Sequence, residues 1–192
     1  MTRLWWVRHA PTHQRSFCGW RDVPADLSDT TALTRLSAFL PLDALVTSSD
    51  LIRATATADA IAAGRERLPP APALREFNFG NWEGLDYTEV STRDPELGRR
   101  YWEEPGDIAA PGGESWNVAA ARVSAHVDAL VAAHPGREIV LVAHLGVILT
   151  QFARARAIAP KDAIGQPIDN LSLTRIAHVA GGWQLECVNH IA

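Results

Sequence analysis

The sequence predicts an α/β fold, in which a mostly parallel central sheet lies between two layers of helices in a three-layer α/β/α sandwich. Short apolar segments alternate along the chain with longer segments whose apolar residues recur at helical spacing, which is typical of this class. Residues 139–143, within EIVLVAH, form the unbroken apolar run that is typical of a buried parallel strand. The chain has 192 residues, a length that suits one domain with a modest insertion.

The first half of the chain is expected to contain a strand at 4–7, a loop at 11–27, a helix at 29–40, a strand at 44–47, a helix at 51–62 and a short strand near 72–74. The helix at 29–40 turns four apolar side chains to one side, those of Leu33, Leu36, Phe39 and Leu40. Gly64 is the expected C-cap of the next helix, because glycine readily adopts the left-handed conformation that ends many helices.

The second half is expected to contain short helices near 88–92 and 95–103, a long helix at 114–133, a strand in EIVLVAH, a helix at 146–156 and closing strands at 171–177 and 183–188. Asp94 and Pro95 favour the N-cap and the first position of the helix that starts there. Residues 76–113 are too long for a plain connection. We therefore expect a single domain over residues 1–192 with an inserted, cap-like segment at about residues 76–113.

Composition and charge exclude several classes of function. A formal net charge of −4 gives little support to nucleic-acid binding, which depends on basic surfaces. No apolar run approaches the ~18 residues of a membrane span, and the N-terminus has no long apolar region, so neither a membrane segment nor a signal peptide is expected. Cys18 and Cys187 form neither a CxxC motif nor a disulfide framework, which favours a cytoplasmic location.

Histidines and charged residues follow the expected strands at the point where each strand ends. Arg8 and His9 follow the first strand, Arg53 begins the helix after the second, Glu76 follows the third, and His144 follows EIVLVA. Ligands of open α/β sheets bind beyond the carboxyl ends of the strands, so we expect these five side chains to converge. Each of them alone is most simply structural, but charged groups gathered at one rim need partners or a ligand.

The convergent set of two histidines, two arginines and one glutamate suits phosphoryl transfer. Arginines supply paired donors for a phosphoryl dianion, a neutral imidazole is a competent nucleophile, and a carboxylic acid can protonate the leaving oxygen. The motifs GxSxG, Walker A, GxGxxG and HExxH of other enzyme classes do not occur. A glycosidase would need two facing carboxylates, and Glu76 with Glu83 would leave the histidines and arginines unexplained.

Seven segments occur in a characteristic order: VRHAPT, FCGWRDVP, SSDLIRATATA, LREFNFGNWEG, PGGES, LVAHLGV and DNLSLTRI. In this order they resemble the motifs of the histidine phosphatase superfamily, and the resemblance covers residues 3–189. FNFGNWEG combined with PGGES is most similar to the α-ribazole phosphatase and small phosphatase branch. The resemblance implies the phosphoglycerate-mutase-like form of the α/β/α sandwich.

The resemblance also implies a role for each residue of the convergent set. His9 is expected to be the nucleophile that becomes phosphohistidine, and Arg8 and Arg53 are expected to hold the phosphoryl oxygens. His144 is expected to stabilise the transferring group, and Glu76 to act first as acid and then as base. The resemblance implies neither a metal nor any other cofactor.

Three residues depart from the family pattern and affect the expected substrate contacts. Ala10 replaces the glycine of the usual RHG, and Arg15 replaces a frequent asparagine. Leu145 replaces the first glycine of the usual HGG and can offer its backbone N–H to a phosphate only if its φ angle stays negative. The expected substrate-binding residues are Arg8, Arg53, Arg15, Cys18, Gly19 and Leu145. Glu83, in the segment WEG, is expected to be a structural turn residue.

The sequence therefore favours a metal-independent phosphomonoester hydrolase that acts through phosphohistidine on α-ribazole phosphate or another small phosphorylated metabolite. A phosphoglycerate mutase and a catalytically inactive, phosphate-binding regulatory protein stay open as alternatives. Family members are often dimers, so a homodimer is compatible with the resemblance. Residues that are candidates either for the mouth of the site or for the core are His13, Arg15, Trp20, Arg21, Trp82, Tyr87, Trp102 and Trp116.

Overall fold

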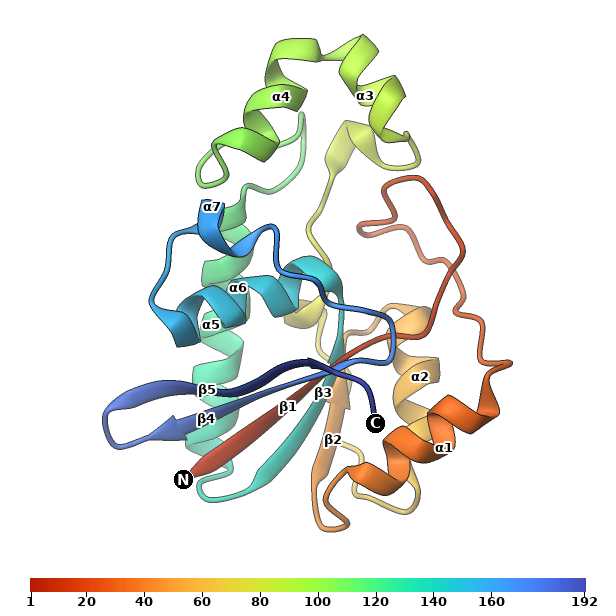
Figure 1. Cartoon of the computed structure of the whole chain (residues 1–192), viewed down its shortest axis with the longest axis vertical. Helices are drawn as coiled ribbons and strands as arrows, with labels where there is room; N and C mark the ends of the chain where they lie inside the picture. The colour runs from red at the N-terminus through yellow and green to blue at the C-terminus, as the bar shows by residue number, and fades with distance from the viewer.

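A five-stranded sheet in the order β2-β3-β1-β4-β5 forms the centre of the computed structural model, which describes residues 1–192 (Figure 1). The strands are β1 (Thr2–Arg8), β2 (Leu45–Ser48), β3 (Glu138–Ala143), β4 (Leu173–Val179) and β5 (Gly182–His190). β3 pairs in parallel with both β1 and β2, whereas β4 runs antiparallel to both β1 and β5. Four strands therefore point in one direction, which confirms the predicted fold class.

Helices cover both faces of this sheet (Figure 1). α1 (Thr30–Phe39) and α2 (Ile52–Ala62) pack on one face, and α5 (Trp116–Ala133) and α6 (Leu145–Arg156) pack on the other. The alternation of side chains along each strand builds the two cores: Leu4 and Trp6 of β1 face α5 and α6, whereas Trp5 and Val7 face α1 and α2. Burial of each large apolar side chain contributes about 1.5–3 kcal/mol relative to exposure.

Residues 76–113 carry a third, smaller core beyond the sandwich. Their helices, α3 (Tyr87–Arg93) and α4 (Pro95–Glu103), lie at the far end of the molecule from the sheet (Figure 1). A 3₁₀ turn, η2 (Gly80–Trp82), leads into them, and Trp82 packs with Val90, Tyr101 and Ala110. Asp86 and Glu89 form a capping box that starts α3.

The prediction of a short strand near residues 72–74 is wrong. Residues 72–74 form a 3₁₀ turn, η1 (Pro72–Leu74), closed by the hydrogen bond from the backbone N–H of Arg75 to the carbonyl of Pro72. Proline has a fixed φ and no N–H, so it suits the first position of such a turn better than a sheet. The chain meets the sheet edge a few residues earlier, where Arg67 forms an isolated bridge with Val46 of β2.

Several smaller expectations also need correction. The C-cap of α2 is Ala63 rather than Gly64, although both have positive φ angles. Asp94 stands at the N-cap of α4, but its carboxylate accepts a hydrogen bond from Trp82 Nε1 instead of capping the helix. Phe39 is 46% exposed rather than turned inward, and the short helix α7 (Pro160–Ala163) was not expected from the sequence. None of the helices combines the length and hydrophobicity needed to cross a membrane.

Candidate active site

A cavity of about 230 Å³ opens at the carboxyl ends of β1 and β3. Four of the five residues expected to converge line its wall, namely Arg8, His9, Arg53 and Glu76. The fifth, His144, is fully buried, and its ring centroid is 5.1 Å from that of His9. The structure therefore brings together all five residues, although they come from segments that are far apart in the sequence.

His9 immediately follows β1, and two backbone hydrogen bonds fix its position. Its N–H donates to the carbonyl of Ala143, and its carbonyl accepts from Asn170 Nδ2. The ring nitrogen Nδ1 lies 2.7 Å from the carbonyl oxygen of Ala10, which can only accept, so Nδ1 carries the proton. The lone pair of His9 is consequently on Nε2.

Burial lowers the pKa of His9 from 6.5 to about 3, and the nearby Arg53 and Arg8 add to the effect. The side chain is thus a neutral imidazole at pH 7, the form that acts as a nucleophile. His144 is fully buried. This burial, together with a smaller effect of the neighbouring His9, lowers the pKa of His144 well below its ordinary value. Neither ring nitrogen of His144 has a hydrogen-bond partner within the protein, so one N–H can serve a bound oxygen.

The two arginines are anchored through their terminal nitrogens. Arg53 is only 1% exposed, and its two Nη atoms donate to the carbonyls of Gly19 and Arg21 at 2.6 and 2.8 Å. Arg8 Nη1 donates to the carbonyl of Ile168 at 2.6 Å. The Nε–H groups of both arginines have no partner in the protein. The loops thus hold two cations in place while donors are left for an oxyanion.

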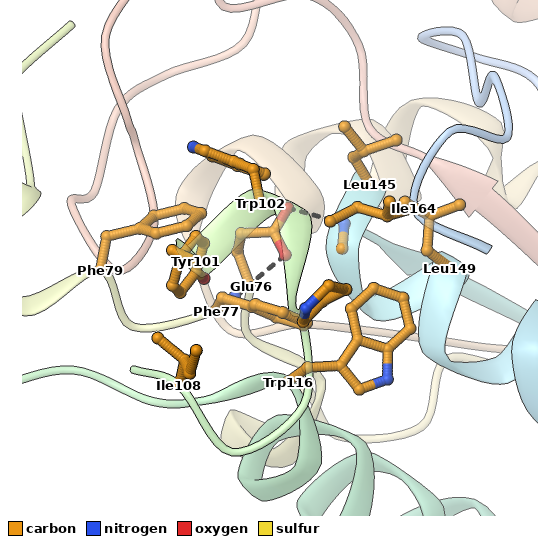
Figure 2. Close-up of a pocket in the computed structure, with 12 residues that line it drawn as sticks. Glu76, Phe77, Phe79, Tyr101, Trp102, Ile108, Trp116, Leu145, Leu149 and Ile164 are labelled. Carbon is orange, nitrogen blue, oxygen red and sulfur yellow. Dashed lines mark hydrogen bonds between the residues drawn. The ribbon is translucent and has the colours of Figure 1, made fainter. Parts of the chain in front are cut away.

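Two backbone N–H groups orient the carboxylate of Glu76, as the dashed lines in Figure 2 show. Phe77 donates to Oε1 at 2.9 Å and Gly146, near the start of α6, donates to Oε2 at 3.1 Å. A Cβ at position 146 would lie 2.5 Å from Oε1, so a larger residue here would shift the carboxylate from this position. Leu145 begins α6 with a negative φ, the condition under which its backbone N–H can be offered to a phosphate.

Glu83 has a structural role, in line with the prediction that WEG is a turn. Its Oε1 accepts hydrogen bonds from the backbone N–H groups of Trp20 and Phe79. These bonds hold the loop that contains Gly19 against the segment that follows Glu76. Gly19 has a φ of +38° and no space for a Cβ beside Glu83, so a side chain here would displace the carbonyl that anchors Arg53.

The predicted substrate-binding residues fall into two groups. Cys18, Gly19 and Leu145 line the cavity together with Arg8 and Arg53. Arg15 is exposed and is not among the lining residues, so its role in binding stays a prediction. Among the candidates for mouth or core, Trp102 lines the cavity and Trp82 belongs to the small third core. No group of three or more His, Cys, Asp and Glu side chains is arranged to hold a metal ion.

Sequence reasoning missed two residues that join the parts of the site. The hydroxyl of Thr57 accepts a hydrogen bond from the backbone N–H of Ala10 and donates to the carbonyl of Arg53. Asn170 holds the carbonyl of His9. Thr57 occurs in SSDLIRATATA and Asn170 in DNLSLTRI, two of the segments that resemble the family motifs, so this resemblance could have pointed to them.

The low pKa of His9 predicts how stability depends on pH. An unfolded histidine takes up a proton near pH 6.5, whereas folded His9 stays neutral down to about pH 3. The unfolded state therefore binds more protons between these values, and the free energy of unfolding falls as the pH is lowered through this range. His9→Ala removes a contribution of up to about 1.4 kcal/mol per pH unit.

Urea unfolding at intervals between pH 7 and pH 4, in phosphate-free buffer, measures this slope. The variant is expected to show a shallower loss of stability than the wild type, whatever its absolute stability. Equal slopes for the two proteins would show that folded His9 titrates like an unfolded histidine.

Comparison with known proteins gives an independent view of the chain. The model of the histidine phosphatase superfamily (branch 1) matches residues 4–191. Bifunctional protein Rv2228c of Mycobacterium tuberculosis is 34% identical over 160 residues, which cover 75% of this chain and 41% of that protein. Glucosyl-3-phosphoglycerate phosphatase of Mycolicibacterium vanbaalenii is 33% identical over 185 residues, which cover 88% of this chain and 76% of that protein. The chain spans about two fifths of the length of the first curated relatives that it matches.

Two solved structures share the fold of this chain. Bacillus stearothermophilus YhfR has a TM-score of 0.91 at 25% identity, covering 100% of this chain and 98% of that one. The alpha-ribazole phosphatase from Shigella flexneri has a TM-score of 0.85 at 22% identity, covering 99% and 97%, which shows a shared fold. Because the family model extends over almost the entire chain, and the residues of its recognised motifs meet in one cavity, this protein belongs to the histidine phosphatase superfamily.

Proposed function

We propose that this chain is a phosphomonoester hydrolase that acts through a phosphohistidine on His9 and requires no metal. The observation that carries the proposal is the state of His9, a buried neutral imidazole whose Nδ1–H is bound to Ala10 and whose Nε2 is left as a nucleophile. Arg8, Arg53 and Glu76 line the same cavity, as a phosphoryl acceptor site of this kind needs. The names of phosphatases among the relatives support the same activity.

The geometry suggests a reaction in two steps. In the first, Nε2 of His9 attacks phosphorus, the bond to the leaving oxygen breaks, and Glu76 as a carboxylic acid gives that oxygen its proton. In the second, Glu76 as a carboxylate takes a proton from water, and the resulting hydroxide displaces His9 from phosphorus. The Nε–H groups of Arg8 and Arg53 and an N–H of His144 stabilise charge on the phosphoryl oxygens throughout.

The activity is tested by release of inorganic phosphate from a panel of phosphomonoesters that includes α-ribazole phosphate, with and without EDTA. Turnover is expected with and without the chelator, and His9→Ala is expected to abolish it. His178→Ala, at an exposed position of β4, is the matched control and should behave like the wild type. A panel without turnover would leave the inactive regulatory protein as the better account.

The same panel distinguishes the mutase alternative through 3-phosphoglycerate. A hydrolase releases inorganic phosphate and glycerate, whereas a mutase returns the 2-phosphoglycerate isomer. We expect no isomerisation, with any turnover of 3-phosphoglycerate releasing inorganic phosphate, and accumulation of the isomer would overturn the proposal. The cytoplasmic location and the homodimer stay predictions.

Glu76→Gln tests the proposed proton transfer, because glutamine keeps the shape of the side chain but cannot donate a carboxylic proton. Hydrolysis of an alkyl phosphate, whose alkoxide leaves poorly, is expected to fall by about 10²–10⁴-fold. Para-nitrophenyl phosphate leaves as a stable phenolate, so its first step is expected to be much less affected. Slow hydrolysis of phosphohistidine should then produce a burst of nitrophenolate before slow turnover.

Glu83→Gln is the matched control, because glutamine retains a side-chain oxygen that can accept hydrogen bonds from Trp20 and Phe79. It is expected to show neither the dependence on leaving group nor the burst. Equal losses of Glu76→Gln on both substrates, with no burst, would remove Glu76 from the role of acid and make Glu83 the next candidate.

A further inference from the structure

A second cavity, of about 110 Å³, shares Glu76 with the catalytic one. Figure 2 shows residues that line this second cavity. Its walls are almost entirely apolar and include Phe77, Ile108, Trp116, Leu149 and Ile164. Glu76 lines both cavities, and so do Phe79, Trp102 and Leu145. The two cavities are therefore neighbours that meet at the carboxylate assigned to proton transfer.

The walls of this apolar pocket come from separate parts of the chain. Phe77 follows Glu76, Ile108 lies beyond α4 in the inserted segment, and Trp116 begins α5. Leu149 belongs to α6, and Ile164 directly follows α7. Figure 2 shows these side chains arranged around the carboxylate of Glu76. The insertion and the sandwich together thus enclose an apolar space beside a catalytic group.

The in-line arrangement of the attacking nitrogen, phosphorus and leaving oxygen places the leaving group on the side of Glu76. In phosphoryl transfer the attacking and leaving atoms lie roughly in line on opposite sides of phosphorus. With His9 on one side, the leaving oxygen lies on the side of its proton donor, Glu76. The carbon attached to that oxygen is then on the side of Glu76, the residue that the apolar pocket shares with the catalytic cavity.

We infer that the preferred substrates are phosphate monoesters of compact apolar alcohols, whose alkyl chain or single aromatic ring occupies this pocket. The inference rests on the proposed function and narrows its substrate class. An engineered apolar cavity of about 150 Å³ binds benzene, so a pocket of about 110 Å³ that shares part of its wall with the larger catalytic cavity suits a group of this size.

Strongly polar leaving groups fit this pocket poorly. Hydroxyl and carboxylate groups, such as those of glucosyl-3-phosphoglycerate, would lose their hydration against walls like Phe77 and Leu149. Besides Glu76, the side chains of the wall offer only the hydroxyl of Tyr101 and the indole N–H of Trp102 in return, too few for several polar groups. The substrate named for the mycobacterial relative therefore does not carry over to this pocket.

A series of straight-chain monoesters, ethyl, propyl, butyl and pentyl phosphate, tests the inference on the wild-type enzyme. These alcohols have nearly equal basicity, so the chemical step makes the same demand on Glu76 throughout the series. Burial of each additional methylene is expected to raise kcat/KM about four-fold until the pocket is full. Glycerol 1-phosphate, which matches propyl phosphate in length but carries two hydroxyls, is expected to be a much poorer substrate.

Two variants place a polar side chain in the pocket wall outside the catalytic machinery, Ile108→Asn and Ile164→Asn. Each is expected to bring the gain in kcat/KM per methylene close to one-fold, a ratio taken within the series of one variant and independent of its absolute activity. Ile191→Asn, at a position that is 54% exposed, is the matched control and should keep the full gain. Circular dichroism identifies any variant that fails to fold. The series of esters on the wild-type enzyme tests the inference even if a variant is lost in this way.

The outcomes separate this inference from the proposed function. Turnover that does not rise with chain length, or glycerol 1-phosphate hydrolysed as fast as propyl phosphate, would overturn the inference and leave the phosphatase activity intact. A gain per methylene that both folded pocket variants retain would also overturn it, because the chain would then be bound elsewhere. Absence of turnover on every ester would instead overturn the proposed function.

Discussion

The parallel pairing of β1 with β3 is the constraint on which the rest of the site depends. Arg8 stands beside Ala143 in the register, so the next residues of the two strands, His9 and His144, must emerge side by side. The hydrogen bond from the N–H of His9 to the carbonyl of Ala143 extends the ladder past the end of β1. Because both strands are buried in the centre of the sheet, the two imidazoles are held on a rigid edge.

Electrostatics and burial then act together on the two histidines. Both side chains lose their hydration, and both have Arg8 and Arg53 nearby, so protonation is opposed by desolvation and by like charge. Neutral histidines leave the arginines as the local cations, with Nε–H groups that the protein does not use. A phosphoryl dianion would thus meet fixed positive charge and a neutral nucleophile together, which is the arrangement that electrostatic catalysis favours.

Sequence patterns were sufficient for the helices α5 and α6, whose apolar residues recur at helical spacing, and for the strands β1 and β3, whose apolar runs contain no proline or glycine. The residues at the ends of these elements then follow from the topology. The segment near Pro72 failed because a short apolar run does not distinguish a strand from a 3₁₀ turn. Thr57 could not be identified, because its two hydrogen bonds depend on how α2 packs against the residue after His9.

The apolar pocket also could not be predicted from the sequence. Its walls include Ile108, Trp116 and Ile164, which belong to different segments and have no spacing in common. Pattern reasoning could describe the aromatic residues only as candidates for the core or for the mouth of the site. The distinction depends on how α4 and the residues that follow it pack against the sandwich, a tertiary contact with no local signature.

The account depends most on His9 Nε2 as the atom that receives the phosphoryl group. Rapid acid-free quenching of the enzyme during turnover of a radiolabelled phosphomonoester, followed by peptide mapping, tests this directly. We expect base-stable, acid-labile phosphate on the peptide that contains His9, with a phosphorus NMR signal typical of Nε2 attachment. Label on Cys18 or on a serine, or phosphate on Nδ1 of His9, would contradict the account.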